Sequence, residues 1–343
     1  MLLSLIATLA LSAAKPTTDP CRDDDGKNRC LPAEQEKMRT LYRVAPIETY
    51  ANAQVRRLFF VDGYGNDIVA LEFVRAAGSG PMVRVHFRHI DGLADLKPLE
   101  EELTLSQWND VLALSRDFEK SFAGPAKASE NGKGKGSDEA MTICLHSSVY
   151  WGEAIDPGAK KRSVVDDACN DPPIETFAWQ AAKMAVAAFP HCDLLDRSLA
   201  RNDASLLANC SGLAGDRLAA ARVFNEAKGF RFLDDKQGGK LAELAGYQIK
   251  LDLQGAAYAG KEAEGAWDKI FADGNTYYYW DEARGIDSET VQVVGGIIRR
   301  GKAEDGSDDQ RADVSMTWEE DGGQFEIESI TAGVFFPYRK SSP

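Results

Sequence analysis

Alternation of apolar and polar residues marks three consecutive strands early in the chain. They cover residues 55–61, 68–75 and 82–88, and glycine-rich turns separate them. In the third strand, apolar residues alternate with basic ones from Arg84 to Arg88, which places the two sets on opposite faces. The pattern predicts an antiparallel meander with one buried face and one exposed face.

Helical periodicity follows the meander. Thr104 and Gln107 form a capping box at the start of a helix whose apolar residues recur every three or four positions. A further strand is expected at 142–153. Three more helices come next, and we expect this α-helical block to pack on the preceding sheet; they cover 174–189, 204–210 and 216–228.

The end of the chain predicts a second group of helices and strands. Helices are expected at 240–253 and 261–271. The strand candidates that follow cover 276–280, 290–300, 312–319 and 324–336, the last two joined by a hairpin turn. Gly295 and Gly296 lie inside one of these strands and predict a bulge or a bend there.

These patterns predict an α+β chain with two domains, because its length exceeds what one hydrophobic core usually holds. The first domain, 36–235, is an N-terminal antiparallel meander with an α-helical block. The second, 240–343, is a small domain with helices and a curved sheet. A polar segment at 15–35 precedes both.

Residues 1–14 have the pattern of a secretory signal peptide. An apolar run at 2–11 is followed by three small residues that suit signal peptidase. The run is too short to span a bilayer, and no later segment approaches the necessary length. We therefore expect a mature chain that begins at Lys15, has no transmembrane segment, and is exported to the periplasm or outside the cell.

The net charge argues against nucleic acid as a partner. The chain has 54 acidic and 40 basic residues, which gives −14. Such a balance repels phosphate backbones and anionic membranes. It otherwise indicates solubility and points to no particular ligand.

The chain has six cysteines, an even number, which in an exported protein indicates disulfides. The sequence alone does not choose among the possible pairings. Because the cysteines fall into three local couples, the simplest prediction pairs neighbours: Cys21–Cys30, Cys144–Cys169 and Cys192–Cys210.

His146 is the candidate catalytic residue. It lies between Cys144 and Ser148 in a predicted strand, where residues two apart share a face but stand about 7 Å from each other. A nucleophile and its base need about 3 Å, so a partner for His146 has to come from elsewhere. A hydrolase with its site near His146 is therefore an alternative to a noncatalytic protein.

Other motifs point to no metal and no cofactor. His86 and His89 fall on opposite faces of a strand, and the acidic run at 23–25 does not fit an EF-hand loop. Glu153 and Asp156 are carboxylates of the kind that glycosidases pair, but nothing singles them out in so acidic a chain. The basic face of the third strand is either an anion site or, more simply, a solvated surface.

Three segments near the end of the chain carry a family resemblance. They are the helix end Trp267–Asp273, the aromatic strand 277–280 and the closing hairpin 318–327. Their arrangement resembles the nuclear-transport-factor-two-like (SnoaL-like) superfamily over about 80 residues. The resemblance implies a cone-shaped fold with a pocket or a dimerisation surface. The Asp/His pairs of that superfamily's enzymes are missing, because no histidine follows His191, so the resemblance implies a noncatalytic role.

Aromatic residues of this region are the candidate ligand-binding site. A bent sheet carrying them either closes on its helix as an ordinary core or leaves a cavity. We expect an exported, noncatalytic protein that binds a small apolar ligand or a protein partner; a hydrolase and a purely structural protein are the alternatives. The candidate binding residues are Trp267, Phe271, Tyr277, Tyr279, Trp318 and Phe325.

Overall fold

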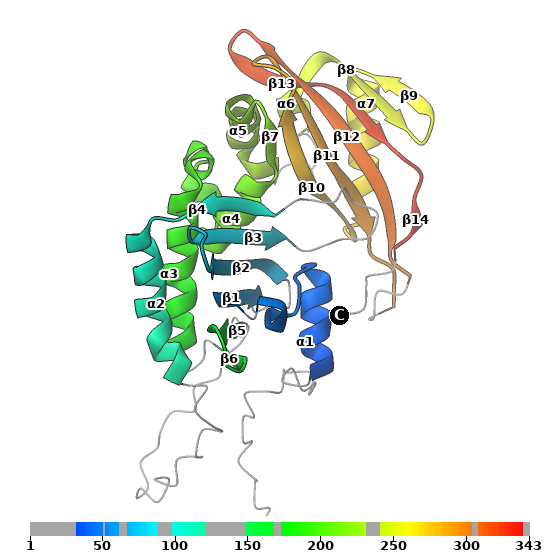
Figure 1. The fold of residues 1–343 in the computed structure, drawn as a ribbon. Helices are drawn as coiled ribbons and strands as arrows, with labels where there is room; N and C mark the ends of the chain where they lie inside the picture. The colour runs from blue at the N-terminus through cyan, green and yellow to red at the C-terminus, as the bar shows by residue number, and fades with distance from the viewer. Residues whose placement is uncertain are drawn as a thin grey trace, which may run out of the picture.

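The computed structural model confirms an α+β fold built on two sheets (Figure 1). Several predicted features lie outside its described residues: the signal peptide, the other two cysteine couples and His146. The structure describes residues 32–50, 52–61, 67–87, 98–120, 149–167, 173–230, 241–303 and 308–338.

The first sheet contains the predicted meander. Its strand order is β4-β3-β2-β1-β5-β6, and every neighbouring pair is antiparallel. The strand expected at 142–153 is observed from Val149 onward. The six strands are β1 (Ala53–Val61), β2 (Asp67–Ala76), β3 (Met82–Phe87), β4 (Leu99–Glu102), β5 (Val149–Ile155) and β6 (Arg162–Asp167).

Helices cover both faces of this sheet. The helices α2 (Leu105–Lys120), α3 (Pro173–Ala188) and α4 (Asp203–Ser211) lie on one side, and α1 (Pro32–Leu41) lies on the other (Figure 1). The capping box is confirmed, since the Thr104 hydroxyl accepts the Gln107 amide and the Gln107 side chain accepts the Thr104 amide. These contacts fix the start of α2.

The second sheet is built mainly from the end of the chain. Its strand order is β7-β10-β11-β12-β13-β8-β9, and β14 pairs with β12. The helix α7 (Lys261–Phe271) packs against β8, β9 and β10. The strands are β7 (Leu213–Gly215), β8 (Ala245–Leu253), β9 (Ala256–Ala259), β10 (Thr276–Gly285), β11 (Thr290–Arg299), β12 (Gln310–Asp321), β13 (Gln324–Ala332) and β14 (Phe336–Pro337).

The helix predicted at 240–253 is wrong. Only a single turn, α6 (Leu241–Leu244), is helical, and the strand β8 follows it directly. In β8 the buried Ile249 and Leu251 alternate with exposed residues, which is the period of a strand. The hairpin then turns at Gln254 and Gly255, both with positive φ, as tight hairpin turns require.

The bulge expected near Gly295 and Gly296 comes from the partner strand. The extra residue is Asp281 in β10, between the pairs Trp280–Gly295 and Glu282–Val294. A side chain on Gly295 would collide with the Tyr279 carbonyl, and one on Gly296 with the Tyr279 hydroxyl. The glycines therefore allow β10 to lie close against β11 at the bulge.

The helical block does not pack on the first sheet alone. The helix α5 (Arg217–Glu226) contacts β10, β11 and β13, and the short strand β7 joins the second sheet beside β10. One continuous hydrophobic core includes residues of both sheets. The domain boundary near 235–240 stays a prediction, and α5, which precedes it, packs on the second sheet.

In the part of the chain that the structure describes, every helix is too short or too polar to cross a membrane.

Candidate functional site

One predicted disulfide is confirmed. Cys192 and Cys210 are bonded, with their Cα atoms 5.0 Å apart, and the bond links the turn after α3 to the end of α4. His191 lies close to both sulfurs, but sulfurs joined in a disulfide are not available as thiolate ligands. Burial and the nearby charge of Arg217 lower the pKa of His191 to about 4, so this histidine is neutral at physiological pH. This cluster is therefore structural.

A row of charged residues, buried at its centre, crosses the first sheet on the face toward α1. Its members lie directly opposite one another on five neighbouring strands and alternate in sign. We call this row the charge ladder, and it consists of Glu153, Arg57, Glu72, Arg84 and Glu100.

The centre of the charge ladder is fully buried and fully paired. Arg57 donates to Glu153 at 2.8 Å and to Glu72 at 2.9 Å, and all three side chains are at most 1% exposed. Burial raises the pKa of Glu72, but the charge and hydrogen bonds of Arg57 outweigh it, and the net effect lowers the pKa. Arg39 and Lys161 each approach Glu153 at 3.0 Å from outside the ladder.

The charge ladder bears on two sequence-based readings. The described part of the basic face of β3 is neither a solvated stripe nor an anion site, because Arg84 is paired with Glu72 and Glu100 and His86 is largely buried; Arg88 lies outside the described residues. Glu153 and Asp156 are not an acid–base pair either: Glu153 belongs to the ladder and Asp156 pairs with Arg56 and Arg162.

The predicted aromatic site is divided between the two faces of the second sheet. Trp267, Phe271, Trp318 and Phe325 are buried, whereas Tyr277 and Tyr279 are half-buried. The strand β10 turns Tyr278 toward α7, with its ring 6.4 Å from that of Trp267.

The neighbouring residue Trp280 packs on Phe224 and Phe230 of the helical block. Tyr277 and Tyr279 instead lie near Arg300 and Arg311. The buried aromatics of the predicted site thus form ordinary core, and the structure does not bring the six residues together.

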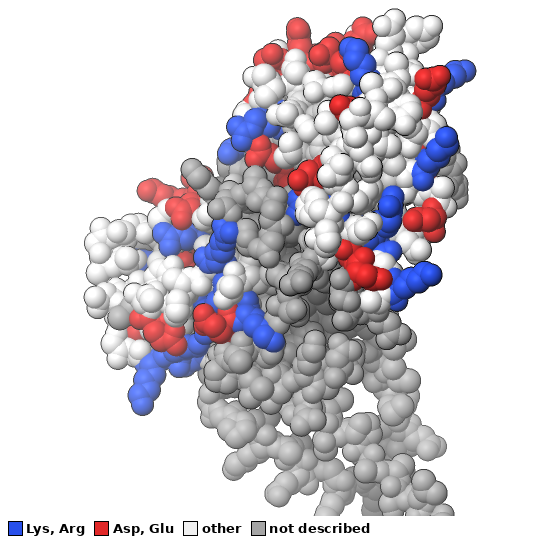
Figure 2. Space-filling view, turned by 90° about the vertical axis from the view of Figure 1, so that its right-hand side faces the viewer, with Lys and Arg blue, Asp and Glu red and all other residues white. Residues whose placement is uncertain are grey.

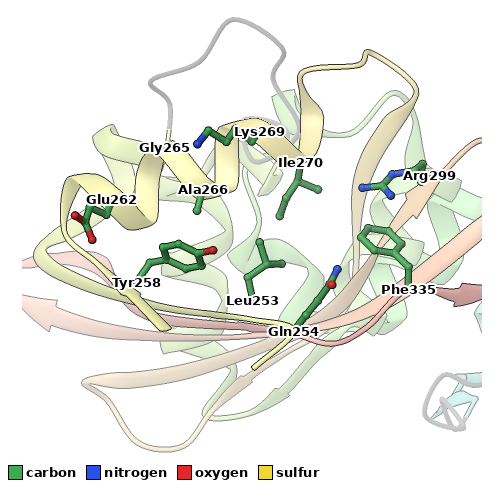
Figure 3. A pocket seen from close by; sticks show the side chains of 10 residues that line it. All are labelled: Leu253, Gln254, Tyr258, Glu262, Gly265, Ala266, Lys269, Ile270, Arg299 and Phe335. Carbon is green, nitrogen blue, oxygen red and sulfur yellow. The ribbon is translucent and has the colours of Figure 1, made fainter. Parts of the chain in front are cut away.

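A pocket lies beside this core, on the other flank of α7. It measures about 610 Å³ and opens between α7, the β8–β9 hairpin and the ends of β11 and β13 (Figure 3). None of the six predicted aromatics lines it. The lining residues are Leu253, Gln254, Tyr258, Glu262, Gly265, Ala266, Lys269, Ile270, Arg299 and Phe335.

The pocket combines an apolar wall with polar and charged side chains, which make up half of its ten lining residues. Leu253 faces Ile270 across it, and Phe335 lies at one end beneath the Arg299 guanidinium (Figure 3). The guanidinium carbon is 4.1 Å from the centroid of the Phe335 ring, a cation–π contact. Glu262 lies at the opposite end.

Sequence reasoning missed this pocket although it identified α7. Ala266 and Ile270 are neighbours of the predicted Trp267 and Phe271 on the helix; all four belong to the hydrophobic core, but only Ala266 and Ile270 also line the pocket. The opposite wall, 253–258, belongs to the β8–β9 hairpin, and the first strand of this hairpin was predicted as a helix. The alternation in β8, followed by a Gln–Gly turn, is the signal that could have identified it.

A second group of titratable residues surrounds the bulge in β10. Asp281 is largely buried, its Oδ2 atom has no hydrogen-bond partner within the described chain, and Arg311 beside it is ion-paired with Asp313 at 2.7 Å. Burial raises the pKa of Asp281 to about 7; Arg311 opposes the rise, and Asp313 and Glu282 add to it. Asp281 is not among the residues that line the pocket beside α7, so we do not include this group in the candidate site.

The described surface on the side drawn in Figure 2 offers no broad charged face as an alternative. Figure 2 shows acidic and basic side chains interspersed over the described surface of the side it displays, without a continuous patch of either sign. The pocket beside α7 is therefore the candidate functional site.

Comparison with known proteins gives a likeness of fold over part of the chain. No model of a protein family matches this chain. No curated protein matches it either.

Among solved structures, a type 2 hexachlorocyclohexane dehydrochlorinase (17% identity, TM-score 0.28) covers 37% of this chain and 93% of its own. An NTF-2-like protein of unknown function from Shewanella oneidensis (15%, TM-score 0.25) covers 31% and 92%. A DUF4783 family protein from Bacteroides uniformis (16%, TM-score 0.25) covers 31% and 90%. The neighbours are NTF2-like folds that span about a third of the chain, and no activity follows from them.

Proposed function

We propose that this chain is an exported, noncatalytic binding protein whose pocket beside α7 takes a small, largely apolar molecule. The observation that carries the proposal is the cavity of about 610 Å³, in which the apolar side chains of Leu253, Ile270 and Phe335 lie among polar and charged ones. Ligand pockets in proteins commonly have roughly 300–1,000 Å³. The signal-like segment and the Cys192–Cys210 disulfide support an exported protein.

The composition of the pocket supports a noncatalytic role. Its lining residues include no histidine, cysteine or serine, so it has no Ser–His or Cys–His pair for nucleophilic catalysis. A hydrolase with its site near His146 is the second candidate, since that residue lies apart from this pocket in the sequence.

Binding of the neutral dye Nile red tests the proposal. Gly265 lines the pocket, and a side chain added there meets no heavy atom within 4 Å. We expect the unmodified protein to bind the dye with increased fluorescence. Gly265→Phe should abolish binding, because its ring occupies the pocket, and it should not lower stability, because phenylalanine favours a helix more than glycine does.

The matched control is Glu264→Phe, which adds the same ring one residue earlier, at a position outside the pocket lining. It should keep the binding of the unmodified protein. Dye binding that is absent from the unmodified protein, or equal in both variants, contradicts the proposed function.

A further inference from the structure

Arg299 is a positively charged residue in the wall of the pocket, and its guanidinium has a hydrogen-bond donor without a partner in the described chain. It lies at the end of β11, and Figure 3 shows its guanidinium directed into the pocket above the Phe335 ring. Its Nε atom is buried and has no hydrogen-bond partner among the described residues. No described carboxylate lies within ion-pair distance of it. The stacked ring fixes the guanidinium without using its N–H groups.

Other buried arginines of the described chain are used differently. Arg57 pairs with two glutamates of the charge ladder, and Arg56 pairs with Glu119 and Asp156. A partly buried guanidinium with an unmatched donor is costly unless something else satisfies it. Arg299 thus differs from these arginines both in its lack of an acidic partner and in its place on the wall of a cavity.

Asp273 is an acidic residue close enough to be affected by the charge of Arg299, but it does not serve as the ion-pair partner of that residue. Asp273 senses the positive charge of Arg299, which contributes to lowering the pKa of that carboxyl. However, the strongest cause of the lowered pKa is the hydrogen bond from the Asn275 amide, and Thr276 also donates to Asp273 at 3.1 Å. The Asp273 carboxylate is therefore occupied in the turn before β10, and it leaves Arg299 facing the pocket.

The charges of the pocket also determine which way round a ligand with an anionic group would bind. Arg299 lies at one end and Glu262 at the other, with Leu253 and Ile270 between them (Figure 3). An anionic group is favoured at the Arg299 end and repelled at the Glu262 end. The middle of the pocket is apolar and suits a hydrocarbon body.

We propose that the ligand is an amphipathic carboxylate, with its carboxylate paired to Arg299 and its apolar body along Leu253 and Ile270. A carboxylate matches the planar fork of a single guanidinium, which donates two parallel hydrogen bonds. This inference rests on the proposed function, because it assigns the ligand class of the same pocket.

Displacement of Nile red by decanoate, decanol and decylamine tests the inference. These ligands share a chain and differ in the head group. On the unmodified protein we expect decanoate to bind at least about tenfold more tightly than decanol, since hydrogen bonds between charged groups are the strong ones. Decylamine should bind most weakly.

Arg299→Met removes the charge and keeps an apolar side chain on Phe335. It should weaken decanoate about tenfold or more and leave decanol unchanged, while Arg299→Lys should retain part of the preference for decanoate. Arg300→Met is the matched control, because Arg300 is the next residue along the chain, is exposed and lies outside the pocket lining, so its effect should be small.

The outcomes separate the two proposals. If Nile red and the whole series fail to bind, the proposed function falls, and this inference falls with it. If decanol and decanoate bind the unmodified protein equally, the pocket is a binding site but the carboxylate assignment is wrong. The comparison of head groups needs no variant, so a misfolded Arg299→Met protein does not remove the test.

Discussion

The two sheets treat their buried charges in opposite ways. In the first sheet, Glu153, Arg57 and Glu72 lie opposite one another and are ion-paired with one another. In the second sheet, Asp281 and Arg299 each keep a buried polar atom without a hydrogen-bond partner in the described chain, and no ion pair is formed by either residue there. The centre of the ladder in the first sheet is thus paired, whereas these two charged residues of the second sheet are not.

This difference helps to separate structure from function. A buried charge that is completely paired can be explained by folding alone. If one partner were removed, the other would be a buried charge without compensation, which strongly destabilises the fold. A buried charge without a pair needs another explanation, and its position decides which one. Arg299 lines the pocket beside α7, where we propose that a ligand pairs with it; Asp281 does not line that pocket, and its burial raises its pKa.

The largest effect is expected from breaking the charge ladder. Arg57→Met removes the central cation and leaves Glu72 and Glu153 buried with fewer partners. We expect the free energy of unfolding to fall by about 3–5 kcal/mol. Urea unfolding followed by circular dichroism measures this change.

The control for the ladder is Arg84→Gln at its more exposed end, where the side chain is 26% exposed. It should cost about 1 kcal/mol or less, because a partly solvated pair contributes little. Equal effects of the two substitutions would show that the position in the ladder does not matter.

Two substitutions in the second sheet should distinguish a core residue from a pocket residue, with a similar or slightly smaller effect on the free energy of unfolding. Trp318 is fully buried and packs against Phe230 with ring centroids 5.9 Å apart, whereas Phe335 lines the pocket. Trp318→Ala should lower the free energy of unfolding by about 3–5 kcal/mol. Phe335→Ala should cost clearly less and weaken dye binding. A Trp318→Ala protein with native stability would show that the ring does not belong to the core.

The sequence could predict local elements of both sheets but not the partners across them. Alternation identified the strand of Arg84 and the strands of the closing hairpin correctly, because side-chain direction in a strand depends only on neighbouring positions. The charge ladder depends on the register of five strands, so Arg57 and Glu72, 15 residues apart, could not be matched from sequence.

The candidate site was predictable only in part. The helix α7 was identified, but its apolar residues serve two surfaces, and the sequence pattern does not tell the Trp267 side from the Ile270 side. The other walls come from separate segments of the chain, which contribute Gln254, Arg299 and Phe335. Their meeting is a property of tertiary packing, and Arg299 carries no local signal that distinguishes it from a surface arginine.

The smallest and most specific effect should come from Asp281. Its folded-state pKa, about 7, lies above the ordinary value of 3.8. Between these values the folded protein holds a proton that the unfolded chain releases, so the contribution of Asp281 to stability is fully present below about pH 4 and is lost as the pH rises to about 7. The charge ladder acts oppositely, because the lowered pKa of Glu72 makes its contribution fall only when the pH drops below the ordinary range of that carboxyl.

Asp281→Asn isolates this effect, because asparagine is neutral at every pH and close in shape. The variant should match the unmodified protein near pH 4 and exceed its free energy of unfolding by about 1–3 kcal/mol near pH 8, within the 1.4 kcal/mol per pKa unit that linkage allows. Unfolding curves at several pH values give the difference between the two proteins, in which the contributions of Glu72 and of the net charge cancel. A difference that does not change between pH 4 and 8 would mean that Asp281 is ionised in the folded protein, with Arg311 as its effective partner. The contrast between the two sheets would then rest on Arg299 alone.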